Sequence, residues 1–187
     1  RLMGLANSIL IGGGMAYTFL AAQGQETGDS MVEQSRVGWA KKMLKEASAS
    51  GVDIFLPVDH VVAKNINSPS SFEVNTHIAP GYMALDIGPV TVARFKEVIL
   101  EAKTLLWNGP MGVFEWDSFA IGSKSVATAM ASQSITSVIG GGSTVEAVSR
   151  FGLRDKMSHV STGGGASLQF LEGRGLPGLD AIFDRSN

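Results

Sequence analysis

The stretch that decides the fold runs from Ile135 to Val148 and reads Ile-Thr-Ser-Val-Ile-Gly-Gly-Gly-Ser-Thr-Val-Glu-Ala-Val. It opens as an apolar, β-branched run, which favours a buried strand. Gly140 to Gly142 then interrupt the run, and glycine best tolerates so tight a turn of bare backbone. Ser143 or Thr144 is a candidate N-cap for a following helix. A strand, a bare turn and a helix start together predict an anion site, because free N–H groups lie at the positive end of the helix dipole.

The same pattern occurs twice more in the chain. Gly12 to Gly14 follow the apolar run that begins at Ile9, and Gly163 to Gly165 follow the run that begins at His159. In a parallel sheet all three turns open at one edge, where open α/β folds bind their ligands. No triplet is followed by the Gly-Lys-Ser/Thr of a P-loop or has the G-x-G-x-x-G spacing of a dinucleotide site. The sequence therefore predicts a nucleotide or phosphate site of another geometry.

Composition limits the class of protein. At 187 residues and 44% hydrophobic, the chain is long enough for one well-buried domain, which we expect over residues 1–187. The net charge of -2 gives no basic surface for nucleic acid, and no apolar run reaches the length of a membrane span. The sequence has no cysteine, so disulfides and thiolate metal sites are excluded. Because the chain enters a strand almost directly after Arg1, we expect it to be a fragment of a larger protein.

Strands and helices are predicted to alternate along the chain. The apolar patterns predict strands at 7–11, 52–58, 104–107, at the start of 135–148 and at 154–161, and helices at 15–22, 31–50, 92–102 and 118–131. Thr91 is expected to cap the third of these helices, and residues 59–89 look irregular apart from a short exposed strand at 72–78. Such alternation predicts an α/β fold of three layers, with a mostly parallel sheet covered by helices on both faces, as in Rossmann-like proteins.

The loop from Trp107 to Glu115 is the second informative site. Gly109, Pro110 and Gly112 restrict its backbone, while Asn108 and Glu115 are the polar groups that it presents. Taken alone, such a loop is more often a structural turn than a ligand wall. Its place at a strand end, in a chain with three glycine triplets, favours the ligand wall, and Glu115 can then accept hydrogen bonds from a ribose.

Other polar and aromatic residues have simpler interpretations. The histidines are scattered and have no partner at metal-ligand spacing, so a zinc site is not predicted, and His159 is interpreted as a core histidine. An apolar stripe on the 31–50 helix is interpreted as core; it contains Trp39, Met43 and Leu44. Three lysines off that stripe are interpreted as a solvated face; they are Lys41, Lys42 and Lys45.

Several motifs together resemble the phosphoglycerate kinases, in the C-terminal, nucleotide-binding domain. They occur in the family's order and lie at Gly12–Phe19, Leu56–Asp59, Leu85–Pro89, Trp107–Glu115, Phe119–Ala120, Ser158–Ser167, Leu171–Gly173 and Leu176–Gly178. The resemblance covers essentially the whole chain. It implies a two-domain, monomeric enzyme that transfers a phosphoryl group between 1,3-bisphosphoglycerate and Mg-ADP, giving 3-phosphoglycerate and Mg-ATP. The resemblance is compatible with an enzyme of the cytosol or of the plastid.

The resemblance also implies a role for individual residues. It places the adenine of ADP or ATP between Gly13–Gly14 and the region of Ala84 and Leu85. It gives a nucleotide-lining role to Asn108, Pro110 and Val113, a ribose contact to Glu115, and phosphate contacts to Gly141, Gly142, Ser143 and Thr144. Gly163, Gly164 and Gly165 would begin the helix whose dipole faces the transferred phosphoryl group.

This sequence departs from the family pattern at three of these places. Ser143 stands where the family has an aspartate that helps to hold the Mg²⁺ of the nucleotide, and serine supplies no anionic oxygen. Ala84 replaces a glycine beside the adenine, and Tyr82 replaces a tryptophan. The N-terminal domain, which binds 3-phosphoglycerate, and the segment with the active-site lysines are not among these residues.

Two hypotheses follow from the sequence. The first is the nucleotide-binding half of a phosphoglycerate kinase, which alone binds ADP or ATP weakly and does not catalyse. The second is a diverged, non-catalytic nucleotide-binding or interaction module that has lost its magnesium ligand at Ser143. A third interpretation, another α/β enzyme that binds a phosphorylated metabolite, is disfavoured by the match at Trp107–Glu115.

Overall fold

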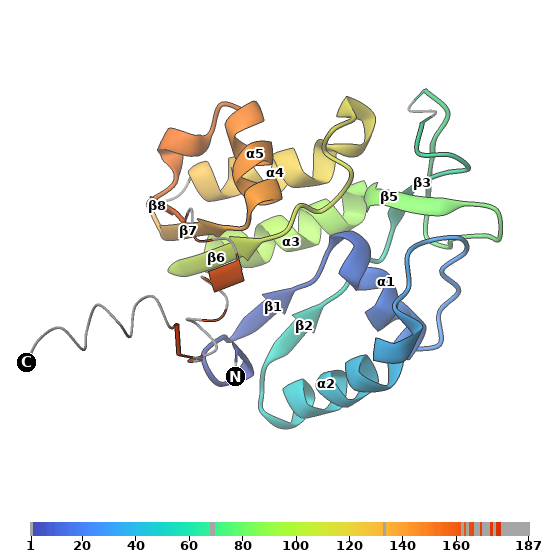
Figure 1. Ribbon diagram of the computed structural model, residues 1–187, viewed down its shortest axis with the longest axis horizontal. Helices are drawn as coiled ribbons and strands as arrows, with labels where there is room; N and C mark the ends of the chain where they lie inside the picture. The colour runs from blue at the N-terminus through green and yellow to red at the C-terminus, as the bar shows by residue number, and fades with distance from the viewer. Residues whose placement is uncertain are drawn as a thin grey trace, which may run out of the picture.

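The computed structural model describes residues 2–67, 70–132, 134–161, 163, 165, 166, 169, 173, 175 and 176 (Figure 1). The helices are α1 (Gly13–Ala22), α2 (Val37–Ala49), α3 (Pro89–Glu101), α4 (Ile121–Ala131) and α5 (Gly142–Arg150). The strands are β1 (Ser8–Leu10), β2 (Asp53–Phe55), β3 (His60–Ala63), β4 (Glu73–Asn75), β5 (Met83–Ile87), β6 (Thr104–Asn108), β7 (Thr136–Gly140) and β8 (His159–Val160). The predicted alternation of strands and helices is confirmed.

The strands form two parallel groups and one antiparallel group. Strand β1 pairs with β2, and β6, β7 and β8 pair in that order, all in parallel. The antiparallel group has the order β4-β3-β5 and lies at one end of the molecule (Figure 1). Pairing in the parallel groups sets Asn108 opposite Gly140 and Ile139 opposite Val160, so the carboxyl ends of β6, β7 and β8 lie at one edge.

Helices cover both faces of the parallel strands. Side chains alternate between the two faces of a strand. Leu10 and Phe55 pack against the core cluster that contains Phe95 and Ile99 of α3 and Met130 of α4. The alternate residues of the same strands belong to a second cluster, with α1 and α2; these residues are Ile9, Ile11 and Ile54. The three-layer α/β fold predicted from the sequence is therefore confirmed.

Of the antiparallel group, the sequence predicted only the exposed strand at 72–78, which contains β4; strands β3 and β5 were missed, because the rest of residues 59–89 looked irregular. Strand β3 is buried along its whole length, but it is only four residues long. Strand β5 carries Asp86 among its apolar residues, and that carboxylate is fully buried. A short run and an acidic residue inside a strand both conceal the apolar pattern by which buried strands are found.

Two predicted helix starts, those of α3 and α5, are wrong. Helix α3 begins at Pro89, a favourable first position, with Gly88 at the N-cap. Thr91 lies inside α3, and its hydroxyl donates to Asp59 Oδ1 at 2.6 Å instead of capping. Neither Ser143 nor Thr144 caps α5, because Gly141 occupies the N-cap position with a φ of 84°.

Other boundaries differ by part of an element. The predicted 31–50 helix begins only at Val37, after a 3-10 turn, and the predicted 154–161 strand is a 3-10 turn followed by the short β8. His159 is exposed rather than in the core, so that interpretation is wrong. Trp39 is 47% exposed, whereas Met43 and Leu44 of the predicted stripe pack inward together with Ala40. None of the helices in the described ranges has the length and apolar character needed to cross a membrane.

Candidate functional site

A large cavity opens where the turns after β1 and β6 meet. Its volume is about 1280 Å³, and its walls come from β1, the start of α1, strand β5 and the chain from Leu106 to Val113. Seven of the residues predicted to bind a nucleotide line it, namely Gly13, Gly14, Ala84, Leu85, Asn108, Pro110 and Val113. The fold thus brings together residues that are separated by up to a hundred positions in the sequence.

The first glycine turn along the chain, Gly12 to Gly14, packs tightly against the 108–113 loop. The N–H of Gly13 donates to Met111 O at 3.0 Å. Gly13 has a φ of 61°, and a Cβ at this position would lie 2.6 Å from Pro110 O. The amide of Gly13 is therefore already used by the protein, which corrects the expectation that every glycine of the turns offers a bare N–H group.

The 108–113 loop is held in one shape from three sides. Val113 N–H donates to Leu85 O at 2.8 Å, which fixes the loop on β5. Met111 N–H donates to Ser123 Oγ of α4 at 2.9 Å. Trp107 Nε1–H donates to Gly109 O at 2.7 Å and closes the turn from inside. A loop held so firmly can present a preformed wall to a ligand.

The second glycine turn, Gly140 to Gly142, contacts the other side of the same loop. Thr144, which is fully buried in the first turn of α5, accepts a hydrogen bond from Gly109 N–H through Oγ1 at 2.6 Å. The side chain of Asn108 lies against Gly140 and Gly141, where an added Cβ would stand 3.1 Å from its amide atoms. The 108–113 loop is therefore clasped between the first and second glycine turns.

The Thr144 contact can be tested by substitution. Thr144→Val keeps the shape of the side chain but leaves Gly109 N–H without its acceptor, and an unsatisfied buried donor costs roughly 1–3 kcal/mol. We expect the free energy of unfolding, measured in urea, to fall by that amount. Thr128→Val is the matched control, because Thr128 is exposed on α4 and its hydroxyl only donates to Lys124 O of the same helix. Equal losses in the two variants would contradict the assigned role of Thr144.

The N-terminus of α5 is open to solvent. Gly142 and Ser143 are exposed in the first turn of this helix, beside the carboxyl end of β6. Amides in the first turn of a helix have no partner within the helix and favour an anion. Within the described residues, no group of three or more His, Cys, Asp or Glu side chains is arranged to hold a metal ion.

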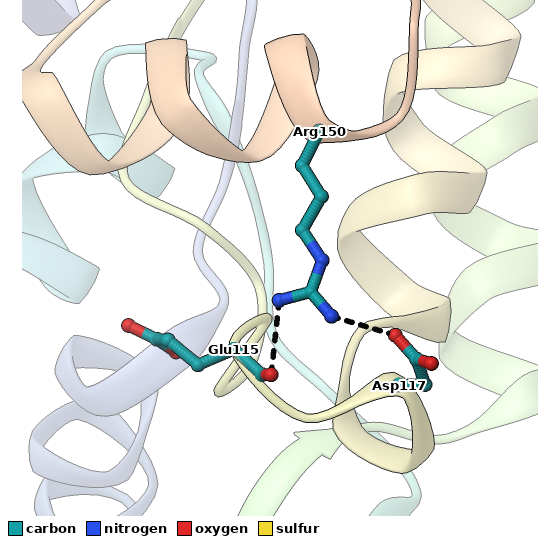
Figure 2. Close-up of polar contacts among 3 residues, drawn as sticks. All are labelled: Glu115, Asp117 and Arg150. Atoms are coloured by element: carbon teal, nitrogen blue, oxygen red, sulfur yellow. Dashed lines mark hydrogen bonds and ion pairs between the residues drawn. The ribbon is translucent and has the colours of Figure 1, made fainter.

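Glu115 lies outside the cavity wall but next to it in the chain. Its carboxylate is exposed and points away from Arg150, as Figure 2 shows. Arg150, at the end of α5, donates from Nη1 to Glu115 O at 2.9 Å and from Nη2 to Asp117 Oδ1 at 2.8 Å. The backbone at Glu115 is thus tied to the helix that carries the second glycine turn.

The sequence prediction missed Arg150 and also Ser30. Arg150 stands 35 positions from Glu115, and nothing local marks an exposed arginine at a helix end as an anchor. Ser30 Oγ accepts the N–H of Ala84 at 3.0 Å and lines the cavity, but it lies in an irregular loop. Both are contacts between distant segments, which the pattern of a single segment does not reveal.

The third glycine turn is described only in part. Gly163 and Gly165 are exposed, and Gly163 N–H donates to Ser161 Oγ at 3.2 Å. Gly164, the middle residue of the triplet, lies outside the described residues. Strand β8, which precedes this turn, pairs with β7, so the turn starts at the same sheet edge as the second glycine turn.

The parallel strands, the helices on both faces and the cavity beside the strand ends define the class of the protein. It has an open α/β fold, the class in which ligands usually bind beyond the carboxyl ends of the strands. The family follows from comparison with known proteins. The model of the phosphoglycerate kinase family matches residues 1–174, so the chain belongs to that family.

Individual relatives agree with this assignment. Phosphoglycerate kinase of Clostridium perfringens is 52% identical over 186 residues, which are 99% of this chain and 47% of the relative. That of Koribacter versatilis is 50% identical over 189 residues, with the same shares. The structure of phosphoglycerate kinase from Coxiella burnetii superimposes with a TM-score of 0.94 at 38% identity, over 100% of this chain and 48% of that one. The chain thus spans about half the length of the curated relatives that it matches.

Proposed function

We propose that this chain is the nucleotide-binding half of a phosphoglycerate kinase and binds ADP or ATP at the cavity rim. The observation that carries the proposal is the clasp around the 108–113 loop. Gly13 holds the loop through Met111 O, and Thr144 holds it through Gly109 N–H. These two contacts fix an apolar surface, on which a base can pack, next to the N-terminus of α5, where phosphates can bind.

The shape of the rim supports one orientation of the nucleotide. The adenine would lie on the apolar part of the wall, between Gly13–Gly14 and Ala84–Leu85, where Pro110 and Val113 complete the lining. The ribose would meet the exposed carboxylate of Glu115. The phosphates would then reach Gly141, Gly142 and Ser143 at the start of α5, where the helix dipole favours negative charge.

The chemistry that we propose for the whole enzyme is phosphoryl transfer between 1,3-bisphosphoglycerate and Mg-ADP. Such transfer depends mainly on positioning and on electrostatic stabilisation. In the proposal this chain positions the nucleotide and supplies oriented backbone amides at the starts of its helices. These amides include those of the turn at Gly163–Gly165. We expect the chain alone to bind nucleotide weakly and not to catalyse, because 3-phosphoglycerate would bind to the other half of the enzyme.

The residues present do not suit a magnesium ion held by the protein itself. Mg²⁺ prefers carboxylate and phosphate oxygens, while Ser143 offers a neutral hydroxyl. No acidic cluster among the described residues compensates for it. In our proposal the metal therefore arrives with the nucleotide, held by the phosphates as part of the substrate.

The proposal is tested by titrating the chain with ADP, with and without Mg²⁺, in a calorimeter. Wild type is expected to bind ADP weakly and with little effect of Mg²⁺. Ser143→Asp adds a carboxylate at an exposed position of α5, so it should strengthen Mg-ADP binding about tenfold, equivalent to ~1.4 kcal/mol. It should weaken binding of ADP without metal, because the carboxylate then repels the phosphates.

Ser143→Asn is the matched control, since it has the size of aspartate without the charge. We expect it to leave the magnesium dependence of wild type unchanged. If wild type binds no adenine nucleotide under either condition and Ser143→Asp changes nothing, the kinase proposal fails for this chain. That outcome would favour the second hypothesis, a diverged interaction module.

A further inference from the structure

Asn108 is the only asparagine of the sequence that a glycine follows. Such a pair loses the side-chain amide of its asparagine more readily than other dipeptides, because glycine has no Cβ to hinder attack by its backbone nitrogen on the asparagine side chain. Gly109 has a φ of 102°, which residues with a Cβ rarely adopt, so the turn after β6 requires glycine at this position. The chain therefore retains a reactive pair for a structural reason.

The side-chain amide of Asn108 is accessible and is not held in place. Asn108 is exposed at the carboxyl end of β6, where it lines the cavity. Its amide group lies against Gly140 and Gly141, but it forms no hydrogen bond with any of the described residues. Water therefore reaches this amide group, and its orientation can change without the loss of a hydrogen bond.

The backbone nitrogen that follows Asn108 is, in contrast, firmly held. Gly109 N–H donates to Thr144 Oγ1 at 2.6 Å, and Thr144 is fully buried in the first turn of α5. Gly109 O accepts the indole N–H of Trp107 at 2.7 Å, so both backbone groups of Gly109 are fixed. Because a buried hydroxyl already accepts the proton of Gly109 N–H, a base in the solvent cannot remove it, and the nitrogen cannot turn toward the side chain of Asn108.

We propose that Asn108 is a deamidation site and that the hydrogen bond from Gly109 N–H to Thr144 controls its rate. When this hydrogen bond opens locally, hydroxide removes the proton of the Gly109 nitrogen, which then attacks Cγ of Asn108. The bond from Cγ to Nδ2 breaks, and Nδ2 takes a proton from water and leaves as ammonia, which regenerates the hydroxide. Water then opens the resulting succinimide ring at either carbonyl, giving aspartate or isoaspartate at position 108. No atom is oxidised or reduced.

Either product changes the rim of the cavity next to the second glycine turn. Aspartate brings a negative charge to the place where the side chain of Asn108 lies against Gly140 and Gly141, at the start of α5. Isoaspartate also lengthens the backbone by one carbon atom between β6 and the 108–113 loop. Both products would oppose the binding of phosphates there, a consequence that rests on the proposed function. The deamidation itself does not rest on it, because no nucleotide takes part in the reaction.

Two threonine-to-valine substitutions test the role of Thr144. Thr144→Val removes the acceptor of Gly109 N–H. Thr91→Val is the matched control, because Thr91 is buried as well and its hydroxyl accepts Val58 N–H and Asp59 N–H instead. Both variants should lose stability, so the pair separates local opening at Gly109 from general unfolding. The folded proteins are incubated without nucleotide, and deamidation at each asparagine is measured by mass spectrometry of their peptides.

We expect Asn108 to lose its amide about tenfold faster in Thr144→Val than in wild type, which corresponds to ~1.4 kcal/mol, the size of one hydrogen bond. In Thr91→Val the rate should stay within about twofold of wild type, because substitutions that share no partner act nearly independently. The rate in Thr144→Val should rise with pH, since removal of the amide proton needs hydroxide. Adding Asn108→Gln to this variant should abolish the reaction, because glutamine would have to form a six-membered ring, which closes far more slowly.

The chemistry of the product and a conservative variant complete the test. Thr144→Ser keeps the hydroxyl, so it should deamidate at the wild-type rate, and Thr144→Ala replaces Thr144→Val if valine prevents folding. The proposal is overturned if Asn108 keeps its amide when the hydroxyl is removed, or if Thr91→Val or Thr144→Ser accelerates the loss as much. It is also overturned if aspartate forms without isoaspartate, because the amide is then hydrolysed directly. Since ADP is absent throughout, failure of the proposed nucleotide site would leave these results unchanged.

Discussion

Gly13→Ala is expected to lower the free energy of unfolding of this protein by roughly 2–4 kcal/mol. Gly13 has a φ of 61°, a conformation that costs an L-residue about 1–2 kcal/mol. The added Cβ would also stand 2.6 Å from the carbonyl oxygen of Pro110. That carbonyl cannot easily move, because Met111 on its far side is held by Gly13 N–H and by Ser123 Oγ.

The neighbouring glycine provides the control for this prediction. Gly14 lies in the same turn of α1, but a Cβ there would meet no atom within 4 Å. Gly14→Ala should leave the stability unchanged or raise it by about 0.5–1 kcal/mol, since alanine favours a helix. Urea unfolding of the two variants with wild type measures the difference. Similar stabilities for the two variants would show that the packing of the first glycine turn on the 108–113 loop contributes little to the fold.

The sequence predicts best the features that depend on a single segment. Each strand-turn-helix unit with a glycine triplet has its own apolar run and its own bare turn, so the bounds of β1 and α1 and the start of β7 were predicted to within two residues, although the cap of α5 was not. The α/β class follows from repeating such units. The prediction that the 108–113 loop belongs to a ligand site rested on local features too, and its residues do line the cavity.

The sequence predicts worst the features that depend on contacts between segments. Thr144 resembles an N-cap by position, but its hydroxyl is taken by Gly109 N–H, 35 positions away. Thr91 is diverted from capping in the same way by Asp59. A side chain with one hydroxyl can serve a local or a distant partner, and only the folded chain decides between them.

Asp86 is the most unusual titratable group near the site. Its carboxylate is fully buried, and among the described residues it accepts two hydrogen bonds, from Ile87 N–H at 2.9 Å to Oδ1 and from Gly122 N–H at 2.7 Å to Oδ2. Burial raises the pKa of Asp86 from its ordinary 3.8 to about 7, and the two backbone hydrogen bonds only partly oppose this effect. The carboxylate lies under the 108–113 loop, where there is no room for a Cβ at Gly112.

This raised pKa predicts that the stability contributed at Asp86 falls as the pH rises. Between about pH 4 and pH 7 the folded chain keeps a proton that the unfolded chain has released, so unfolding becomes easier by up to ~1.4 kcal/mol for each pH unit. Above the folded pKa of about 7 both states are ionised and the effect is constant. His60, whose pKa is lowered chiefly by burial, acts in the opposite direction and partly masks the trend in wild type.

Comparison with Asp86→Asn isolates the pH dependence of stability that comes from Asp86, because the variant keeps His60 and every other titrating group. Asparagine costs a fixed amount, since its NH₂ group faces one of the two backbone donors, but that cost does not vary with pH. The free energy of unfolding of wild type minus that of Asp86→Asn should therefore fall steadily between about pH 4.5 and pH 7 and then level off. Urea unfolding at a series of pH values measures this difference. A difference that stays constant, or that increases with pH, would mean that the two backbone donors outweigh burial and keep Asp86 ionised in the folded chain.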